Sequence, residues 1–565
     1  MYFTSGNTPD TPRSDLPDLL TALATDLRNI EYTVDGVSRL LGESAYAALS
    51  RDQLIPALIV TGAAAKGERV PAALAAVVRL WLLAVPQPAE VLDAALPGIG
   101  SEGLLTLGLV EPTTTDGPAV GALVQAKVDL RPYGWLPTEA EDPAAGAEQA
   151  AGQAPDNGAE LWVASDLAAH QQPGVLRHDH VLGIGQASTT LVQTTIRRHV
   201  AKALDLGTGC GIQAFHLLRH AEHVTVTDIS PRALAFTRFN LLLNAGELHI
   251  DPANLESRVS LRLGSLLEPV AGEEFDLVVS NPPFVITPRS ADEASTDQFT
   301  YRDGGLPGDD IVASLVLTLP GILAPGGTAQ LLGNWEITSG GLWDARPRTW
   351  VEASRSGTSA AVDAWFIQRE QLSPELYAET WLRDASETRD RQHYQESYSN
   401  YLDDFASRDV AGIGFGMIWL RRPADAAAQP SITRFEEITY PIEQPIGPCL
   451  GAAVERSDWL AGNDLANTHL LVAEDVTEER HQRPGAEHPG VILLRQGAGL
   501  RRTNLLSTEL AGFVSACDGD LSVRQIIGAL EALLGGGDGF DGDAFRAGLL
   551  QEVYHLVQDG FLLPA

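Results

Sequence analysis

The chain has few cysteines, and they are not spaced as pairs. Cys210, Cys449 and Cys517 are the three cysteines in 565 residues, and no two of them form a CxxC pair. An odd number of thiols without paired spacing argues against a disulfide framework and against a zinc site. We therefore expect no bound metal and a reducing, cytoplasmic location.

The sequence also lacks a long uninterrupted apolar run. Its first residues have neither the basic start nor the apolar stretch of a secretory signal. The most apolar window, Ala72 to Val85, is interrupted by Arg79 and is too short to cross a bilayer. This window is expected to be a buried helix, and no membrane partner is expected.

Basic residues are scarce relative to acidic ones. The chain has 39 Lys and Arg against 74 Asp and Glu, which gives a formal net charge of −35. This charge repels phosphate backbones at long range and argues against broad affinity for nucleic acid, although it is compatible with a local basic groove. The length exceeds one ordinary domain, and 44% hydrophobic with 20% charged residues is the composition of a globular protein.

A glycine-rich turn follows the short apolar run that ends at Asp205 and Leu206. The turn reads Gly207-Thr208-Gly209-Cys210-Gly211, and apolar residues with helical spacing follow it. Strand, tight glycine turn and helix N-terminus are the context in which a ligand approaches the backbone closely. The G-x-G-x-G spacing differs from the G-x-G-x-x-G of dinucleotide-binding proteins. Asp205, just before the turn, can accept hydrogen bonds from an ammonium group.

A second β-branched run, His223 to Thr227, ends at Asp228. An acid about twenty residues past a glycine turn, at the end of the second strand, is placed to bind both hydroxyls of a ribose. The alternative is a ligand-free α/β turn in which the aspartate caps a helix.

The motif Asn281-Pro282-Pro283-Phe284 follows the apolar run Phe275 to Ser280. A double proline cannot donate to a sheet ladder, so the strand must stop there. Asn281 and Phe284 then project beyond the carboxyl edge of the sheet, where ligands of open α/β folds bind. The Asn281 side-chain oxygen and the Pro282 carbonyl can accept hydrogen bonds from an NH2 group, and Phe284 can stack on a flat amide or base. The alternative is a plain strand-ending turn.

These two motifs, in this order, resemble those of class I S-adenosylmethionine-dependent methyltransferases that carry Asn-Pro-Pro-(Tyr/Phe). That group includes release-factor glutamine (HemK-like), adenine-N6 and small-subunit rRNA guanine-N2 methyltransferases. The Asp-Gly-rich run from Tyr301 to Asp310 is similar to the segment that follows the catalytic motif in the glutamine methyltransferases. The segment from Leu323 to Leu332 is similar to the usual class I turn into the fifth strand. The resemblance covers residues 161–422.

The resemblance implies S-adenosyl-L-methionine as the cofactor and a Rossmann-like α/β sheet as the fold. Ser265 departs from many relatives, which have an aspartate there that contacts the adenine amino group; Ser265 or the backbone of Leu266 can make that bond. The resemblance assigns cofactor binding to Asp205, Gly207, Thr208, Gly209, Gly211, Asp228, Ile229, Ser265, Leu266 and Asn281. It assigns catalysis to Asn281, Pro282, Pro283 and Phe284.

The methyltransferase domain is expected over residues 161–430, flanked by two modules. Residues 1–136 are mostly helical in spacing and end in an alternating run, which indicates a winged-helix-like module or a plain helical cap. Residues 137–160, rich in alanine, glycine, proline and acids, are expected to be a flexible acidic linker. Residues 431–565 are expected to form a winged-helix-like α+β module with a helical core stripe at Phe545, Leu549, Val553 and Leu556.

The predicted function is methyl transfer to a planar nitrogen of a macromolecule, with a protein glutamine side chain as the favoured acceptor. Such catalysis is mostly positioning and charge complementarity, which fits the lack of a convincing His/Asp dyad. One alternative acceptor is a base amino group in RNA or DNA, which Phe284 would stack on but which the negative charge opposes. Another alternative is a non-catalytic cofactor-binding scaffold. The oligomeric state is not predicted.

Overall fold

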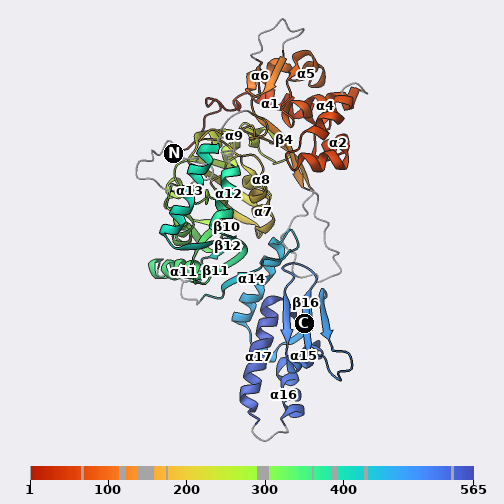
Figure 1. Ribbon diagram of the computed structural model, residues 1–565, viewed down its shortest axis with the longest axis vertical. Coiled ribbons are helices and arrows are strands. Elements are labelled where there is room, and N and C mark those ends of the chain that lie inside the picture. The colour runs from red at the N-terminus through yellow and green to blue at the C-terminus, as the bar shows by residue number, and fades with distance from the viewer. Residues whose placement is uncertain are drawn as a thin grey trace. The chain divides into compact units, whose positions relative to one another are not determined.

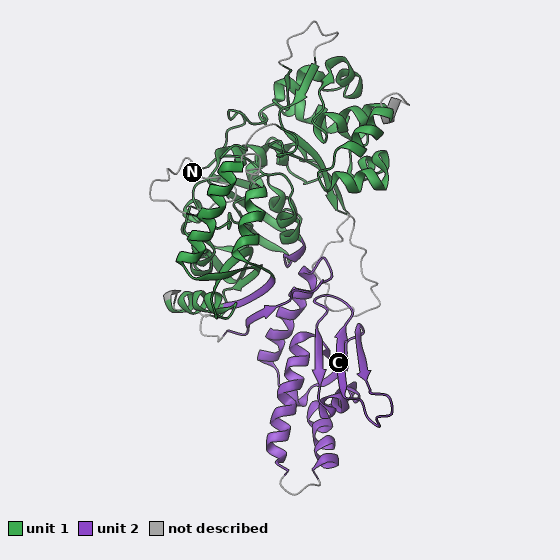
Figure 2. Ribbon diagram, in the orientation of Figure 1, with its two compact units in different colours: residues 1–192, 198–362, 370–427 green, residues 193–197, 363–369, 428–565 purple. Residues whose placement is uncertain are grey.

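In the computed structural model, the described residues are 2–64, 69–113, 123–135, 158–172, 176–288, 305–358, 362–384, 391–425, 430–535 and 540–565. They form two compact units (Figure 2). The first comprises residues 1–192, 198–362 and 370–427, and the second comprises residues 193–197, 363–369 and 428–565. Residues 301–304 of the Asp-Gly-rich run and residues 137–157 of the predicted linker lie outside the described residues.

The largest sheet has eight strands in the order β13-β11-β12-β10-β9-β6-β7-β8. Figure 1 labels β10, β11 and β12 of this sheet. Strands β10, β9, β6, β7 and β8 run parallel, and β12 runs antiparallel to β10. After β8 the chain returns to the other side of β6, so the topology switches between β6 and β9. The predicted Rossmann-like α/β sheet is confirmed. The strands are β6 (Val200–Leu206), β7 (Ala221–Asp228), β8 (Val259–Leu263), β9 (Phe275–Ser280), β10 (Leu323–Thr338), β11 (Asp363–Leu372), β12 (Val410–Arg421) and β13 (Thr433–Glu437).

Helices connect these strands and pack against them. Helices α8 and α9 contact β7, α10 and α11 contact β10, and α12 and α13 contact β12. Helix α9 begins with a proline at its first position, and the Oγ of its N-cap Ser230 accepts the Ala233 N–H at 3.3 Å. The helices are α7 (Gln186–Thr194), α8 (Ile212–Leu217), α9 (Pro231–Leu243), α10 (Asp310–Thr318), α11 (Ala345–Thr358), α12 (Pro374–Asp384) and α13 (Arg391–Ser407).

The N-terminal region combines helices with a small sheet of order β1-β3-β2. From α4 onward the elements follow as helix, strand, helix, helix, strand, strand, which is the order of a winged helix and favours that alternative over a plain helical cap. The window at Ala72 to Val85 supplies most of α4, and its Val77 and Trp81 are buried, as predicted. The elements are α1 (Pro17–Asn29), α2 (Val34–Leu49), α3 (Ile55–Ala64), α4 (Arg69–Trp81), β1 (Gln87–Pro88), α5 (Ala89–Ala95), α6 (Gly100–Leu107), β2 (Val110–Pro112) and β3 (Leu123–Ala126). Within the described ranges, no helix has the length and apolar character needed to cross a membrane.

Two strands border the predicted linker. Strands β4 (Asp129–Trp135) and β5 (Ala159–Ser165) pair antiparallel, with Trp135 opposite Ala159. The described residues on either side of residues 136–157 therefore lie on neighbouring strands, and the last two residues of the predicted linker belong to β5. Strand β5 is fixed to α9, because the Asn240 side chain bonds the N–H and the carbonyl of Ala164 at 2.8 and 2.9 Å. The predicted division at residues 136 and 161 stays a prediction.

The second unit has a core of its own. Leu549, Val553 and Leu556 of the predicted helical stripe are buried in it, and Phe545 packs against it partly buried. Strand β14 lies between β18 and β19, and β15, β16 and β17 form a second small sheet. The elements are α14 (Gly447–Gly462), β14 (His469–Val472), β15 (Val476–His481), β16 (Val491–Gln496), β17 (Thr503–Leu506), α15 (Thr508–Val514), β18 (Asp518–Ser522), α16 (Val523–Leu534), α17 (Gly542–Asp559) and β19 (Leu562–Pro564).

Candidate functional site

The two sequence motifs end neighbouring parallel strands. Leu206 of β6 lies opposite Ser280 of β9, so Gly207 and Asn281 leave the sheet side by side. The Ser280 hydroxyl donates to the Leu206 carbonyl at 2.8 Å and ties the two strand ends together. Because the topology switches between these strands, this edge is where open α/β sheets bind their ligands.

The glycine turn leaves room next to its backbone. Gly207, Gly209 and Gly211 have φ angles of 76°, 58° and 94°, the left-handed region that glycine adopts without strain. A Cβ added to Gly207 or Gly209 would meet no heavy atom of the described residues within 4 Å, whereas at Gly211 it would lie 3.1 Å from Thr237 Cγ2. The first two glycines therefore border open space, and the third permits close packing on α9.

Asp205 is a buried carboxylate at the end of β6, with 1% of its surface exposed. Its Oδ2 accepts hydrogen bonds from Thr208 Oγ1 at 2.7 Å and from Ala214 N at 3.1 Å, whereas Oδ1 has no hydrogen bond among the described residues. Burial raises the pKa of Asp205 to about 7. A cationic ligand at Oδ1 would favour the charged form. Thr208, also predicted to bind the cofactor, directs its hydroxyl to this carboxylate.

Asp228, at the end of β7, is bonded directly to the glycine turn. Its Oδ2 accepts the Gly209 N–H at 3.0 Å, and its Oδ1 accepts the Ser230 N–H at 2.8 Å. Burial raises the pKa of Asp228. Each oxygen keeps a second lone pair that a hydroxyl can use. Ile229, 58% exposed, places an apolar side chain beside this carboxylate.

The loop after β8 carries Ser265 and Leu266 beside the end of β7. The Gly264 N–H donates to the Asp228 carbonyl at 3.0 Å and holds the start of the loop there. Leu266 has a φ of 45°, a strained conformation for a branched side chain. Such strain concentrates at ligand sites, and here it occurs where the sequence predicts the adenine contact.

Asn281 differs from the other polar groups of the site. Its Oδ1 is buried and has no hydrogen-bond partner among the described residues. The Pro282 carbonyl accepts the Phe284 N–H at 2.8 Å, which closes a tight turn directly after the strand and uses one of its two lone pairs. A buried amide oxygen left unbonded costs about 1–3 kcal/mol, and an N–H from a ligand would remove that cost.

Residues 166–300 match the family described as the Methyltransferase small domain. This range of the chain contains the glycine turn, Asp228, the Ser265–Leu266 loop and Asn281. Residues 29–122 match a second family, described as Domain of unknown function (DUF7059). The predicted resemblance to methyltransferases is confirmed by the first match.

Three curated relatives match part of this chain. The release factor glutamine methyltransferase of Geobacter sulfurreducens is 34% identical over 165 residues, which are 27% of this chain and 51% of that protein. The ribosomal protein uL3 glutamine methyltransferase of Bradyrhizobium diazoefficiens is 32% identical, over 27% of this chain and 46% of that protein. The ribosomal RNA small subunit methyltransferase C of Cronobacter sakazakii is 29% identical, over 30% of this chain and 46% of that protein. The chain spans about half the length of these relatives.

Among solved structures, the Thermus thermophilus 16S rRNA N2 G1207 methyltransferase in complex with AdoMet and guanosine is 17% identical. The match covers 48% of this chain and 62% of that chain with a TM-score of 0.21. A likeness of this size adds nothing to the strand order described above.

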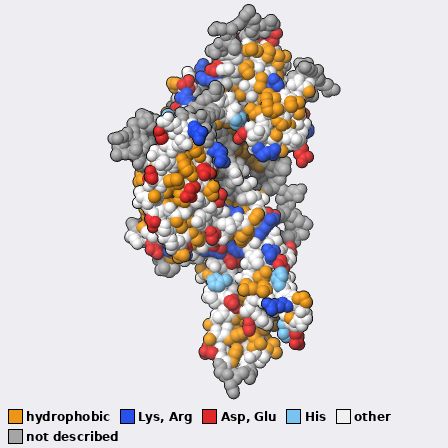
Figure 3. All heavy atoms as spheres, viewed as in Figure 1, with side chains coloured by type: hydrophobic (Ala, Val, Ile, Leu, Met, Phe, Trp, Pro, Cys, Tyr) orange, Lys and Arg blue, Asp and Glu red, His pale blue; other side chains and the backbone are white. Residues whose placement is uncertain are grey.

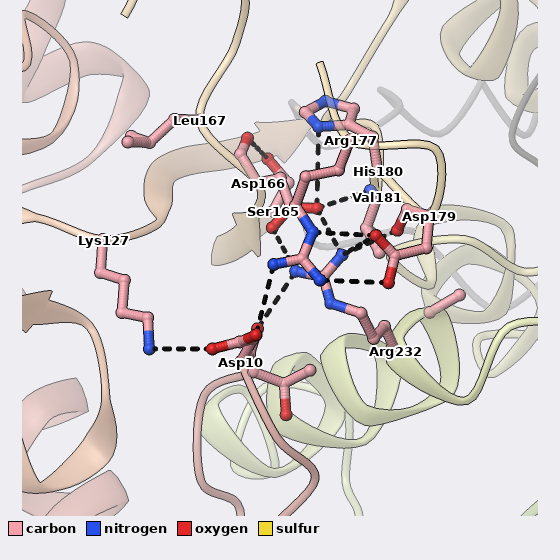
Figure 4. A network of polar contacts seen from close by, with 12 residues as sticks. Asp10, Lys127, Ser165, Asp166, Leu167, Arg177, Asp179, His180, Val181 and Arg232 are labelled. Carbon is pink, nitrogen blue, oxygen red and sulfur yellow. Dashed lines mark hydrogen bonds and ion pairs between the residues drawn. The ribbon is translucent and has the colours of Figure 1, made fainter. Parts of the chain in front are cut away.

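Within residues 166–300, a charged network fixes the first turn of α9 (Figure 4). Arg232, 6% exposed, bonds both carboxylate oxygens of Asp166 at 2.7 and 2.9 Å and the Asp179 carbonyl at 2.7 Å. This turn directly follows Asp228, so the network supports the placement of that carboxylate. A cavity of about 380 Å³ borders the network, and its lining includes none of the predicted site residues. The described ranges hold no group of three or more metal-ligating side chains.

The end of the Asp-Gly-rich run is anchored by buried charges. Asp309, fully buried, accepts hydrogen bonds from Arg346 Nε at 2.7 Å and from the Glu336 N–H at 2.8 Å. Glu336 in turn pairs with Arg408 Nη2 at 2.7 Å, and burial raises the pKa of Glu336. These contacts hold the run against the carboxyl end of β10.

Two buried polar residues near Asn281 were not predicted. Tyr377 Oη accepts the Ile286 N–H at 2.8 Å and Asn334 Nδ2 at 3.0 Å, and both side chains are fully buried. An amide within the apolar run of β10 is a signal that could have indicated Asn334. Tyr377 gives no such signal, because its backbone partner lies 91 residues away in the chain.

Proposed function

We propose that the protein is an S-adenosylmethionine-dependent N-methyltransferase whose acceptor is a glutamine side chain of a protein. The observation that carries this proposal is the buried Oδ1 of Asn281, which has no hydrogen-bond partner among the described residues and lies at a strand end beside the glycine turn. A neutral oxygen in that position is complementary to the N–H of a planar amide.

The residues of the glycine-turn side fit S-adenosylmethionine. Asp205 Oδ1 is available for the ammonium group, and the lone pairs of Asp228 are available for the ribose hydroxyls. Open space at Gly207 and Gly209 supports approach of the ligand to the backbone, and the strained backbone of Leu266 supports an adenine contact by the Ser265–Leu266 loop. The bound cofactor supplies an electrophilic methyl group on a sulfonium.

Asn281 and Phe284 orient the acceptor nitrogen. Asn281 Oδ1 accepts one N–H of the acceptor amide, and the second lone pair of the Pro282 carbonyl accepts the other. Phe284, half-buried, stacks on the amide plane. With both N–H bonds held, the nitrogen lone pair faces the methyl group, and catalysis comes from alignment. The proton leaves after transfer, so no strong base is required.

Charge favours a protein acceptor over a nucleic acid. The formal charge of −35 opposes long-range attraction to phosphates, and Figure 3 shows acidic and basic side chains interspersed on the visible face. Two of the relatives above are named as glutamine methyltransferases. A base amino group in RNA is the second candidate, supported by Phe284 as a stacking surface and by the relative named for ribosomal RNA. The cytoplasmic location predicted from the unpaired cysteines is part of this proposal.

The decisive experiment is transfer of labelled methyl groups from S-adenosylmethionine into a bacterial extract cleared of small molecules. We expect protease, and not nuclease, to release the label from the macromolecular fraction. Acid hydrolysis should then release labelled methylamine, because only an N-methylated amide yields it on cleavage of its C–N bond. Nuclease-sensitive label would support the RNA alternative. Specific cofactor binding without any transfer would support a scaffold.

A further inference from the structure

We propose that Tyr377 is a positioning residue that fixes the catalytic loop after β9, which runs from Asn281 to Ile286. The inference rests on the proposed function, because it assigns Tyr377 an effect on transfer that acts through Asn281. It concerns a contact between α12 and the loop that neither the sequence motifs nor the family matches contain.

The loop has few backbone donors with which to fix itself. Pro282 and Pro283 have no N–H, and the Phe284 N–H is used within the turn by the Pro282 carbonyl. The Ile286 N–H donates to Tyr377 Oη at 2.8 Å, and Ile286 is only 1% exposed. This hydrogen bond ties the loop to a helix outside the motif.

The Tyr377 ring is fixed independently of its hydroxyl. It packs edge-on to Phe405 and stacks with Phe415, each at 5.6 Å between ring centroids. The cluster around it contains Ile286 and the buried side chains of α12, α13 and β12. A phenylalanine at position 377 would keep these apolar contacts and would lose only the hydrogen-bonding oxygen.

Asn334, in the strand next to β9, orients the Tyr377 hydroxyl oxygen. Its Nδ2 donates to Tyr377 Oη at 3.0 Å, and it lies in β10, which pairs with β9 through Leu331 and Ser280. The Tyr377 oxygen thus accepts two hydrogen bonds and links β10, α12 and the loop. Burial raises the pKa of Tyr377, so the phenol remains neutral and available as an acceptor.

The first test compares Tyr377→Phe with Tyr398→Phe by hydrogen exchange and mass spectrometry of the full chain. Tyr398 is a matched control, because it packs against the same cluster and its hydroxyl bonds Glu379 at 3.3 Å instead of the loop. Tyr377→Phe should speed exchange of the Ile286 amide about ten-fold, the loss expected for one buried hydrogen bond. Equal exchange in both variants would overturn the proposed anchor.

The second test separates positioning from general stability. With labelled S-adenosylmethionine and the cleared extract, Tyr377→Phe should slow single-turnover transfer about ten-fold while the cofactor Kd stays within about two-fold. In an Asn281→Ala background the same change should slow the residual transfer less than about two-fold, because Tyr377 acts through Asn281. Asn334→Ala should reproduce the effect of Tyr377→Phe on transfer more weakly.

Each outcome bears on a definite claim. Equal slowing by Tyr377→Phe in the parent and in the Asn281→Ala background would overturn the inference and indicate a structural role. A parallel loss of cofactor affinity would overturn it as well. If the parent chain transfers no methyl group to any fraction, the proposed function fails, and the exchange experiment still decides whether Tyr377 holds the loop.

Discussion

The two halves of the candidate site satisfy their polar groups in opposite ways. On the glycine-turn side, the carboxylates of Asp205 and Asp228 accept four hydrogen bonds from their own surroundings before any ligand binds. On the other side, the Asn281 side-chain oxygen accepts none from the described residues. The first half is therefore largely preorganised, with Asp205 Oδ1 as its unbonded oxygen among the described residues, whereas the second half holds an acceptor that an N–H of a ligand would satisfy.

The difference follows from charge. A buried carboxylate without hydrogen bonds costs far more free energy than a buried neutral amide oxygen, so the protein must satisfy Asp205 and Asp228 itself. An unbonded amide oxygen costs about 1–3 kcal/mol, which a folded domain can tolerate. A neutral acceptor can thus be left without any hydrogen bond from the described residues, whereas Asp205 leaves only its Oδ1 unbonded and keeps two hydrogen bonds at Oδ2.

The substitution Asn281→Ala should have the largest effect and tests the difference between the two halves most directly. If Asn281 touches the acceptor nitrogen alone, transfer should fall a hundred-fold to nearly a thousand-fold, about 3–4 kcal/mol in the transition state. Cofactor affinity should be nearly unchanged. Single-turnover rate, calorimetric Kd and melting temperature on the same variant measure all three quantities.

Asn244→Ala is the matched control for that variant. Asn244 is also buried, but its side chain is fully bonded, to the Trp162 N–H, the Trp162 carbonyl and the Asn240 carbonyl at 2.9, 2.7 and 2.7 Å. Its removal should lower the melting temperature and leave the rate per folded molecule unchanged. A parental rate in folded Asn281→Ala would refute the catalytic assignment.

Asp228→Ala tests the preorganised half. Loss of two charge-assisted hydrogen bonds to the ribose should weaken S-adenosylmethionine binding about thirty-fold or more, on the order of 2–3 kcal/mol. Asp276→Ala is the control, because that carboxylate also accepts a backbone N–H, from Lys202 at 2.9 Å, near the start of β9. Calorimetry showing equal cofactor affinity in the two variants would contradict the assignment.

The protonation of Asp205 gives a second test of the glycine-turn half, through its dependence on pH. Its folded pKa of about 7 lies above the ordinary 3.8, so the stability contributed by its protonation is complete below the ordinary value and is lost as pH rises towards 7. Binding has the opposite sign, because the ammonium needs the carboxylate. The cofactor should bind about ten-fold more weakly at pH 6 than at pH 8, which is a ten-fold higher Kd.

Asp205→Asn should remove both effects. Its affinity should stay weak and independent of pH between 6 and 8, and the ligand-free variant should melt higher than the parent at pH 8, since no carboxylate is buried. Calorimetry and thermal melts at the two pH values check this. A parental pH profile in the variant would show that Asp205 does not bind the ammonium.

The smallest effect is expected for Ser280→Ala, which removes the hydrogen bond between the two strand ends of the candidate site. Loss of the 2.8 Å bond to the Leu206 carbonyl should lower the free energy of unfolding by about 1 kcal/mol. The cofactor Kd and the transfer rate should each change by less than about three-fold. Ser457→Ala, which removes an equally buried hydroxyl bonded to Ala453 in α14, is the control. A much larger loss of rate in Ser280→Ala alone would mean that the halves are not independent.

Much of the site could be predicted because its signals are local. The strand ending at Leu206, the positive φ of Gly207 and the stop imposed by Pro282 each depend on a few consecutive residues. Periodicity and turn chemistry report such features directly. The same holds for the helical stripe of Leu549, Val553 and Leu556, which is buried as its spacing predicts.

The sequence by itself determined where the predicted site residues lie in the fold, because their positions are fixed by where a strand ends and a turn begins. The tertiary structure alone decided which polar groups are satisfied. Packing brings together the partners of the Ile286–Tyr377 hydrogen bond and of the Asn240 contacts to β5. It also leaves the Asn281 side-chain oxygen without a partner among the described residues. Hydrogen-bond satisfaction is a property of neighbours in space, and no pattern along the chain encodes a distance between residues 91 positions apart.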